Sequence, residues 1–517
     1  MNTKVKSTVS IWVVVLLSFV SLAAAGGDLS VVEAVQRGDR ETVRSLLQRV
    51  DANETQPDGA TALSWAVHRN DLESAELLIQ AGADVNATND YGVTPLSLAC
   101  ANIQNAAMVK RLLEAGSNPN SVQVKGETVL MTCSRTGNAE AVKLLLAHGV
   151  EVETKEPWRW QTALMWAAAK KHSDVVALLV EHGADVHSQT RGSFTPLMFA
   201  AQQGDIDSAR ILLTAGADVN QASPQYGTAL VVASASGREQ VAIFLLEQGA
   251  GPNETDSHGN TPLHYAVRKG FSELDGVRYD ANRPRPSNMP MLAQALIEHG
   301  ANVNVRIKEF LKMRDDRPPI DITGATPFFL AAVSTDVPLM KLLADNGADI
   351  RLAVNEKTTP LIAAAMGACP GECRGMGKNE QNKQWESQAF AAVKMAVELG
   401  ADVNATNDKG ETAMHIAGFT GSDSIIQFLA DKGAVVDPVA KSGETPWTMA
   451  MGISANLGIR GTYGHHESTV ALLLKLGAKV RGREGMDPRG RLALVGNVGA
   501  EDGEIQPIDP DENQRYP

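Results

Sequence analysis

One pattern returns every 33 or 34 residues along most of this 517-residue chain. The pattern is a threonine with an apolar residue two places later. It occurs eleven times, starting at Thr61, Thr94, Thr128, Thr162, Thr195, Thr228, Thr261, Thr326, Thr359, Thr412 and Thr445. A second marker, Gly followed by Ala or a similar residue, lies 21 or 22 residues after the threonine in eight of the eleven copies. A fixed period of this length predicts a stacked array of small repeats instead of one large core.

The copy at Thr195 shows the expected local structure. Thr195-Pro196 predicts a helix start. Proline has no backbone N–H, but the N–H groups of a first helical turn have no partner within the helix, so proline is tolerated there. A second helix follows, with apolar residues at i, i+3 and i+4 from Ala209. We expect Gly216 to end it in the left-handed conformation. Such a unit is too small to bury its own apolar face, so the copies must stack.

These residues closely resemble the ankyrin repeat. The segment Thr261-Pro262-Leu263-His264-Tyr265-Ala266 matches the family signature, and Gly82-Ala83-Asp84-Val85-Asn86 matches its usual exit from the second helix. The resemblance implies an all-α repeat solenoid of stacked helix–turn–helix units with short β-hairpins. It covers residues 58–485, with an N-terminal capping copy at 26–57.

The first residues predict export. Lys4 and Lys6 precede an apolar run, and Ala23-Ala24-Ala25 supplies a small-residue cleavage site. We interpret residues 1–25 as a signal peptide, and expect no membrane span once it is removed. The mature chain is then expected in the periplasm or outside the cell, and a bacterial envelope fits an exported ankyrin array best.

Four places carry residues beyond the repeat, near 272–288, 306–320, 369–388 and 453–466. Long loops on a rigid scaffold often carry specificity, although neutral drift of surface loops is an equal alternative. The tail at 486–517 loses the pattern and is expected to be flexible.

The four cysteines fall into two kinds. Cys100 and Cys133 stand where the family places alanine, which predicts small, buried, reduced residues. Cys369 and Cys373 lie in an insert, where an oxidising compartment favours a local disulfide, with a metal-ligand or redox pair as the alternative.

The sequence gives little support for an enzyme, and we expect no cofactor or metal. The formal net charge of −13 argues against nucleic-acid binding. The remaining alternative is a metal- or redox-handling envelope protein whose site combines Cys369 and Cys373 with His465 and His466.

The favoured function is a monomeric scaffold that binds another protein. In the ankyrin family, partner contacts come from the residues just before each repeat threonine, at the hairpin tips. Here these are Asp90, Tyr91, Trp158, Arg159, Trp160, Arg191, Phe194, Tyr226, His258 and Asn260. Trp, Tyr and Arg dominate interface energies, so we expect a partner across copies three to eight, anchored by Trp158, Phe194 and Tyr226. The alternative for Trp160 is packing against a neighbouring hairpin.

The export interpretation predicts that the mature chain begins at Gly26. Mass spectrometry of the exported protein measures this directly. An intact Met1, or retention in the cytoplasm, would contradict it.

Overall fold

The structure, a computed structural model, describes residues 29–267, 289–309, 321–367, 380–452 and 466–480. The chain forms two compact units, Met1–Ala167 with Glu181–Ala184, and Ala168–Val180 with Asp185–Pro517. Each copy of the repeat contributes a pair of helices, and one pair is divided between the two units.

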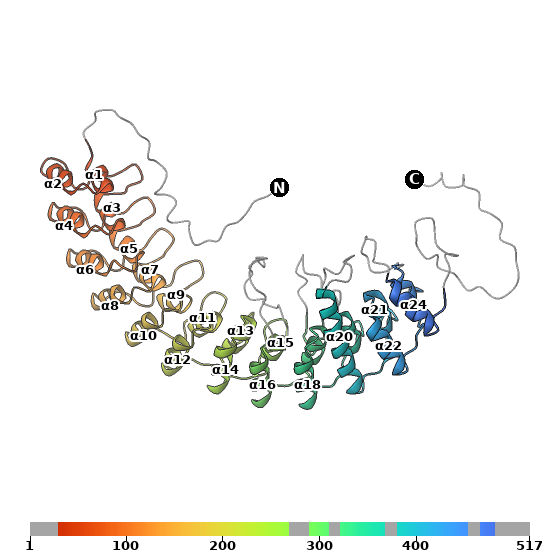
Figure 1. Cartoon of the computed structure of the whole chain (residues 1–517). Helices are drawn as coiled ribbons and strands as arrows, with labels where there is room; N and C mark the ends of the chain where they lie inside the picture. The colour runs from red at the N-terminus through yellow and green to blue at the C-terminus, as the bar shows by residue number, and fades with distance from the viewer. Residues whose placement is uncertain (1–28, 268–288, 310–320, 368–379, 453–465, 481–517) are drawn as a thin grey trace, which may run out of the picture. The chain divides into compact units, whose positions relative to one another are not determined.

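In unit 1 the first helices of the copies form one row and the second helices form another (Figure 1). The loops that precede the first helices project away from the second-helix row. The first helices are α1 (Val31–Arg37), α3 (Ala62–His68), α5 (Pro95–Cys100), α7 (Val129–Thr136) and α9 (Ala163–Ala168). The second helices are α2 (Arg40–Leu46), α4 (Leu72–Gln80), α6 (Ala106–Glu114) and α8 (Ala139–Ala147).

Unit 2 repeats this arrangement. Its first helices are α11 (Pro196–Gln203), α13 (Ala229–Ala235), α15 (Pro262–Val267), α17 (Pro327–Val333), α19 (Pro360–Met366), α21 (Ala413–Thr420) and α23 (Pro446–Ala450). Its second helices are α10 (Ser173–Glu181), α12 (Ile206–Thr214), α14 (Glu239–Glu247), α16 (Pro290–Glu298), α18 (Val337–Asp345), α20 (Glu380–Glu398), α22 (Asp423–Asp431) and α24 (Glu467–Lys475).

The repeat threonine starts the first helix because its side chain replaces a missing backbone acceptor. The Thr195 hydroxyl accepts a hydrogen bond from the Met198 N–H at 3.2 Å, and Pro196 follows in the first turn. Asp205 caps the second helix through the Ser208 N–H at 3.2 Å. Gly216 adopts φ +94°, the left-handed conformation expected for it. The markers in the sequence are therefore helix boundaries.

In the α5–α7 pair the fifth residue after the repeat threonine, Cys133, lies at the contact between consecutive first helices. We call this fifth place the contact position. This contact position is fully buried in all eleven copies. It is alanine in ten of them: Ala66, Ala99, Ala167, Ala200, Ala233, Ala266, Ala331, Ala364, Ala417 and Ala450. The sixth place faces the next copy, since a β-carbon on Gly418 would clash with the Pro446 carbonyl oxygen. Small side chains here let the helices stack.

Asparagines at the exits of the second helices link successive copies. The Asn53 Nδ2 donates to the Gly82 carbonyl oxygen at 3.2 Å, and its Oδ1 accepts from the Asp84 N–H at 2.7 Å. The same pair of bonds recurs at Asn86, Asn220, Asn253, Asn304 and Asn404. Each amide thus satisfies one donor and one acceptor of the following copy. We call these six residues the asparagine ladder.

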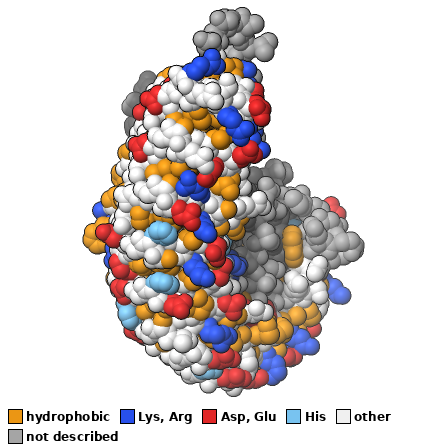
Figure 2. Space-filling model, turned by 90° about the vertical axis from the view of Figure 1, so that its left-hand side faces the viewer, with side chains coloured by type: hydrophobic (Ala, Val, Ile, Leu, Met, Phe, Trp, Pro, Cys, Tyr) orange, Lys and Arg blue, Asp and Glu red, His pale blue; other side chains and the backbone are white. Residues whose placement is uncertain are grey.

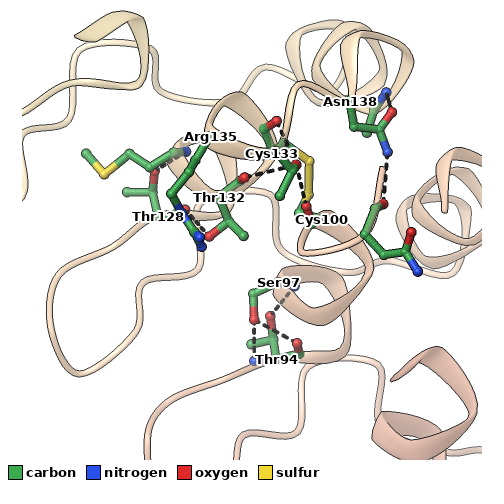
Figure 3. Close-up of a disulfide and its surroundings, with 12 residues drawn as sticks. Thr94, Ser97, Cys100, Thr128, Thr132, Cys133, Arg135 and Asn138 are labelled. Carbon is green, nitrogen blue, oxygen red and sulfur yellow. Dashed lines mark hydrogen bonds between the residues drawn. A yellow bond between two sulfur atoms is a disulfide. The ribbon is translucent and has the colours of Figure 1, made fainter. Parts of the chain in front are cut away.

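The prediction that Cys100 and Cys133 are reduced is wrong. Their sulfurs form a disulfide between α5 and α7, with Cα atoms 4.5 Å apart (Figure 3). The physical reason is register: Cys100 is the sixth residue after its threonine, and Cys133 is the fifth after the next. These two places face each other across the stack. The predicted Cys369–Cys373 bond lies outside the described residues.

The all-α solenoid expected from the sequence is confirmed, but across the described residues the expected β-hairpins are represented only by isolated bridges. The described segments contain no strand, only isolated bridges at Thr55–Thr61, Val122–Thr128 and Ser223–Gly227. The inserts near 272–288 and 453–465, most of 306–320, the signal peptide and the tail lie outside the described segments. Residues 380–388 of the third insert lengthen α20, which has 19 residues. Within the part of the chain that is described, no helix has the length and apolar character needed to cross a membrane.

His415 links two copies through both ring nitrogens. Its Nδ1 accepts from the Thr412 N–H at 3.1 Å, and its Nε2 lies 3.3 Å from the Glu444 carbonyl oxygen of the next copy. The side chain is fully buried. Burial removes the imidazolium from water and lowers the pKa of His415 from 6.5 to about 4, although the Glu444 carbonyl opposes the shift. The neutral ring therefore holds the stack.

Stability should fall as the pH drops from about 6.5 to about 4. The unfolded state takes up a proton near pH 6.5 and the folded state does not, so the loss approaches about 3 kcal/mol near pH 4. The urea midpoints of the wild type and of His415→Ser at pH 7.5 and pH 5 measure it.

Serine is the matched control because Ser97 caps α5 from the same place without titrating. Subtracting the pH dependence of the variant from that of the wild type removes the contribution of the carboxylates, which both proteins share. An identical pH dependence in both would contradict the role given to His415.

Candidate partner-binding site

Two hairpin tips of unit 1 are held by a polar side chain at the start of the loop. In the first complete example, Asn89 Oδ1 accepts from the Tyr91 N–H at 3.1 Å and the Val93 N–H at 3.0 Å. Gly92 takes φ +70° and closes the turn. Asp90 is exposed and Tyr91 is 48% exposed, so the turn presents both side chains outward.

Neighbouring tips are joined by backbone hydrogen bonds. The Asp90 N–H donates to the Asp58 carbonyl oxygen at 3.0 Å, and the Val124 N–H donates to the Tyr91 carbonyl oxygen at 3.1 Å. Val122 and Val124 are 50% and 75% exposed. Sequence reasoning missed these valines, although two β-branched residues in a polar loop were a visible signal.

The next hairpin departs from this pattern and carries two tryptophans. It is one residue longer, and a buried carboxylate replaces the amide cap. Glu156 is 6% exposed, and its oxygens accept from the backbone N–H groups of Trp158, Arg159 and Gln161 at 2.7, 2.8 and 3.1 Å. Three bonds to one buried carboxylate fix the backbone of the tip.

Trp160 occupies a backbone conformation that usually belongs to glycine. Its φ is +61°, whereas Gly59, Gly92 and Gly126 hold the equivalent places in the preceding hairpins. A bulky residue there costs about 1–2 kcal/mol. Trp158 is 74% exposed and Trp160 is 48% exposed. Strain at an exposed aromatic pair is typical of a functional site.

The tryptophan hairpin packs against the preceding one. A β-carbon on Gly126 would clash with the Pro157 ring, so only glycine fits between the two loops. Contact therefore continues from hairpin to hairpin along unit 1. We call the exposed apolar side chains of these three hairpins the tip stripe: Tyr91, Val122, Val124, Trp158 and Trp160.

Part of the first-helix row lies behind these hairpins and offers aromatic rings. The Trp65 Nε1 donates to Gln56 Oε1 at 3.0 Å. The Arg135 guanidinium lies 5.4 Å from the centre of the Trp166 ring and bonds Glu127, at the base of its own hairpin, at 3.1 Å. These contacts hold the helices and the loops of unit 1 together.

The partner-binding residues expected on unit 2 differ in their exposure to solvent. Phe194 is only 8% exposed, and its ring packs edge-on against Phe199 at 4.7 Å and Tyr226 at 5.5 Å. Asn260 is 2% exposed and donates to Asp256 at 3.0 Å. Both side chains pack within the hairpins of unit 2 and expose little surface to a partner. Arg191 is exposed, while Tyr226 and His258 are half-buried.

The charges around these positions are mixed. Asp58 and Asp90 flank one end of the tip stripe, and Arg159 lies at the other. Figure 2 shows the opposite side, that of the second helices of unit 1, where acidic and basic side chains are also interspersed. The few mixed charges beside the tip stripe favour an apolar contact with local charge pairing over attraction by net charge.

The structure offers no metal site among the residues it describes. These contain no group of three or more His, Cys, Asp or Glu side chains that could hold an ion. Cys369, Cys373 and His465 lie outside them. The His466 ring packs on Gly421, at the start of α24.

Family comparisons agree with the fold. A model of three ankyrin repeats matches residues 31–123, 99–190, 130–223 and 197–279, and a model of many ankyrin repeats matches residues 386–430. These matches together cover more than half of the chain, which therefore belongs to the ankyrin-repeat family. Ankyrin repeats are protein-interaction modules, so the chain is a scaffold for protein–protein interaction.

Individual relatives resemble parts of the array. Human transient receptor potential cation channel subfamily A member 1 is 28% identical over 140 residues, 27% of this chain and 12% of that protein. Human ankyrin repeat and SOCS box protein 6 is 36% identical over 100 residues, 18% of this chain and 24% of that protein. The matches thus span less than a quarter of each relative. The solved human ASB11 ankyrin repeat domain is 28% identical and covers 43% of this chain and 98% of its own, with a TM-score of 0.39.

The tip geometry predicts that Glu156→Ala lowers the free energy of local opening of the tryptophan hairpin by about 2–4 kcal/mol. The substitution removes three hydrogen bonds to a carboxylate. Amide hydrogen exchange of Trp158, Arg159 and Gln161 measures the effect. Glu156→Gln is the matched control, since its one oxygen still accepts from Arg159 and Gln161. Unchanged exchange at these three amides in Glu156→Ala would show that the carboxylate does not hold the tip.

Proposed function

We propose that this chain is an exported scaffold that captures a partner protein on the tip stripe of unit 1. The observation that carries the proposal is the tryptophan hairpin. Trp158 and Trp160 stay largely exposed on a backbone that is held by a buried carboxylate and strained at one residue. Such a rigid, exposed aromatic pair binds with little further loss of entropy.

The surroundings of the pair support binding to protein. Tyr91, Val122 and Val124 extend the apolar surface along adjacent hairpins, and Asp90 and Arg159 place charges at its margins. Aromatic anchors ringed by polar groups are typical of interface hot spots. Arg191, Tyr226 and His258 on unit 2 are secondary candidates, and Phe194 and Asn260 are not.

Export is the second part of the proposal. It is supported by the charged start, apolar run and Ala23-Ala24-Ala25 site of the sequence. The Cys100–Cys133 bond also favours an oxidising compartment, because structural disulfides are rare where thiols are kept reduced. The periplasm or the outside of a bacterial cell fits both observations.

The test compares capture of envelope proteins by the mature chain and by its variants. We expect the double variant Trp158→Ala with Tyr91→Ala to reduce capture of a specific partner at least about 100-fold, since hot-spot truncations cost about 2 kcal/mol or more each. The helical circular-dichroism signal should not change. Lys409→Ala is the control, because Lys409 is the exposed equivalent of Tyr91 in a later hairpin.

Two outcomes would overturn the proposed face. Equal loss of capture in Lys409→Ala would mean that the effect is not specific to unit 1. Capture that survives the double variant, but is lost when 272–288 and 369–386 are shortened, would move the binding surface to the inserts.

A further inference from the structure

One contact between first helices differs from the others in the described array. At every other copy the contact position holds alanine, whereas the α5–α7 contact is covalent. Cys100 and Cys133 are both fully buried. Beside them the Thr136 hydroxyl donates to the Cys100 carbonyl oxygen at 2.8 Å. The bond therefore lies inside a packed contact (Figure 3).

The two joined helices also carry the centre of the tip stripe. Tyr91 lies three residues before Thr94, the N-cap of α5, and Val124 lies four residues before Thr128, the N-cap of α7. The Val124 N–H donates to the Tyr91 carbonyl oxygen at 3.1 Å. Separation of α5 from α7 would therefore also separate these two tips.

We propose that the Cys100–Cys133 bond is a redox-dependent staple of the binding face. When oxidised it fixes the Tyr91–Val124 junction, and when reduced it lets the two copies part. The importance of this junction for binding rests on the proposed function. The staple itself rests only on the position of the disulfide.

The chemistry is ordinary thiol–disulfide exchange. Two cysteine thiols give up two protons and two electrons to a small disulfide such as oxidised glutathione, which leaves as two thiols. Dithiothreitol reverses the reaction, and its own two thiols become a cyclic disulfide. Because neither protein sulfur is exposed, both reactions need α5 and α7 to open briefly. The staple should therefore form and break slowly in the folded chain.

The experiment measures amide hydrogen exchange in the mature chain, first oxidised and then after prolonged treatment with dithiothreitol. We expect reduction to speed exchange in the Tyr91 and Val124 hairpins by about tenfold or more, since the array then opens locally at that junction. The hairpin at 440–444 in unit 2 should not respond. Peptide mapping without reductant should find Cys100 joined to Cys133.

The double variant Cys100→Ala, Cys133→Ala is the control. It places alanine at both sites, keeps Cys369 and Cys373, and should exchange at one rate with or without dithiothreitol. Absence of the linked peptide, or equal exchange before and after reduction of the wild type, would overturn the staple. A response of the double variant equal to that of the wild type would do the same. The exchange measurement uses no partner, so a failure of capture would refute the proposed function and leave the staple standing.

Discussion

The close approach of consecutive first helices is the contact on which the array depends. Each copy is a pair of short helices with too little apolar surface to fold alone. Stacking requires one place per copy with a small side chain, which is alanine in ten of eleven copies and the disulfide-bonded Cys133 in the other. The helix caps, the asparagine ladder and the His415 bridge all act around this contact.

The repeat made most of this fold predictable from the sequence. Thr195 and Gly216 mark helix boundaries whose chemistry is local, so a single copy was enough to place them. Cys100 and Cys133 could not be placed in that way, because their pairing depends on which place of one helix faces which place of the next. The clue was their spacing of 33 where the threonines are 34 apart, and it has meaning only once the stacking register is known.

The candidate site, like the fold, could be predicted only where the responsible interactions are local. Exposure of Trp158 and Trp160 followed from their place in the hairpin, and the missing glycine at 160 was visible in the sequence. Phe194 and Asn260 occupy similar places but face inward, toward Phe199 and Asp256. The role of Glu156 was hidden because its partners are backbone groups, which no sequence pattern displays. Packing around each loop therefore decides which tip residues reach a partner.

The asparagine ladder also bears on chemical modification. Asn53, Asn86, Asn253 and Asn404 each stand two residues before a threonine, in the Asn-x-Thr triplet that N-glycosylation requires. In the stacked array their Nδ2 atoms already donate to the next copy, and the adjoining Oδ1 atoms accept from it. Each Nδ2 carries two hydrogens, and the bond to the next copy uses one of them. A sugar in the place of the donated hydrogen would break this link between copies, although all four asparagine side chains are exposed to solvent.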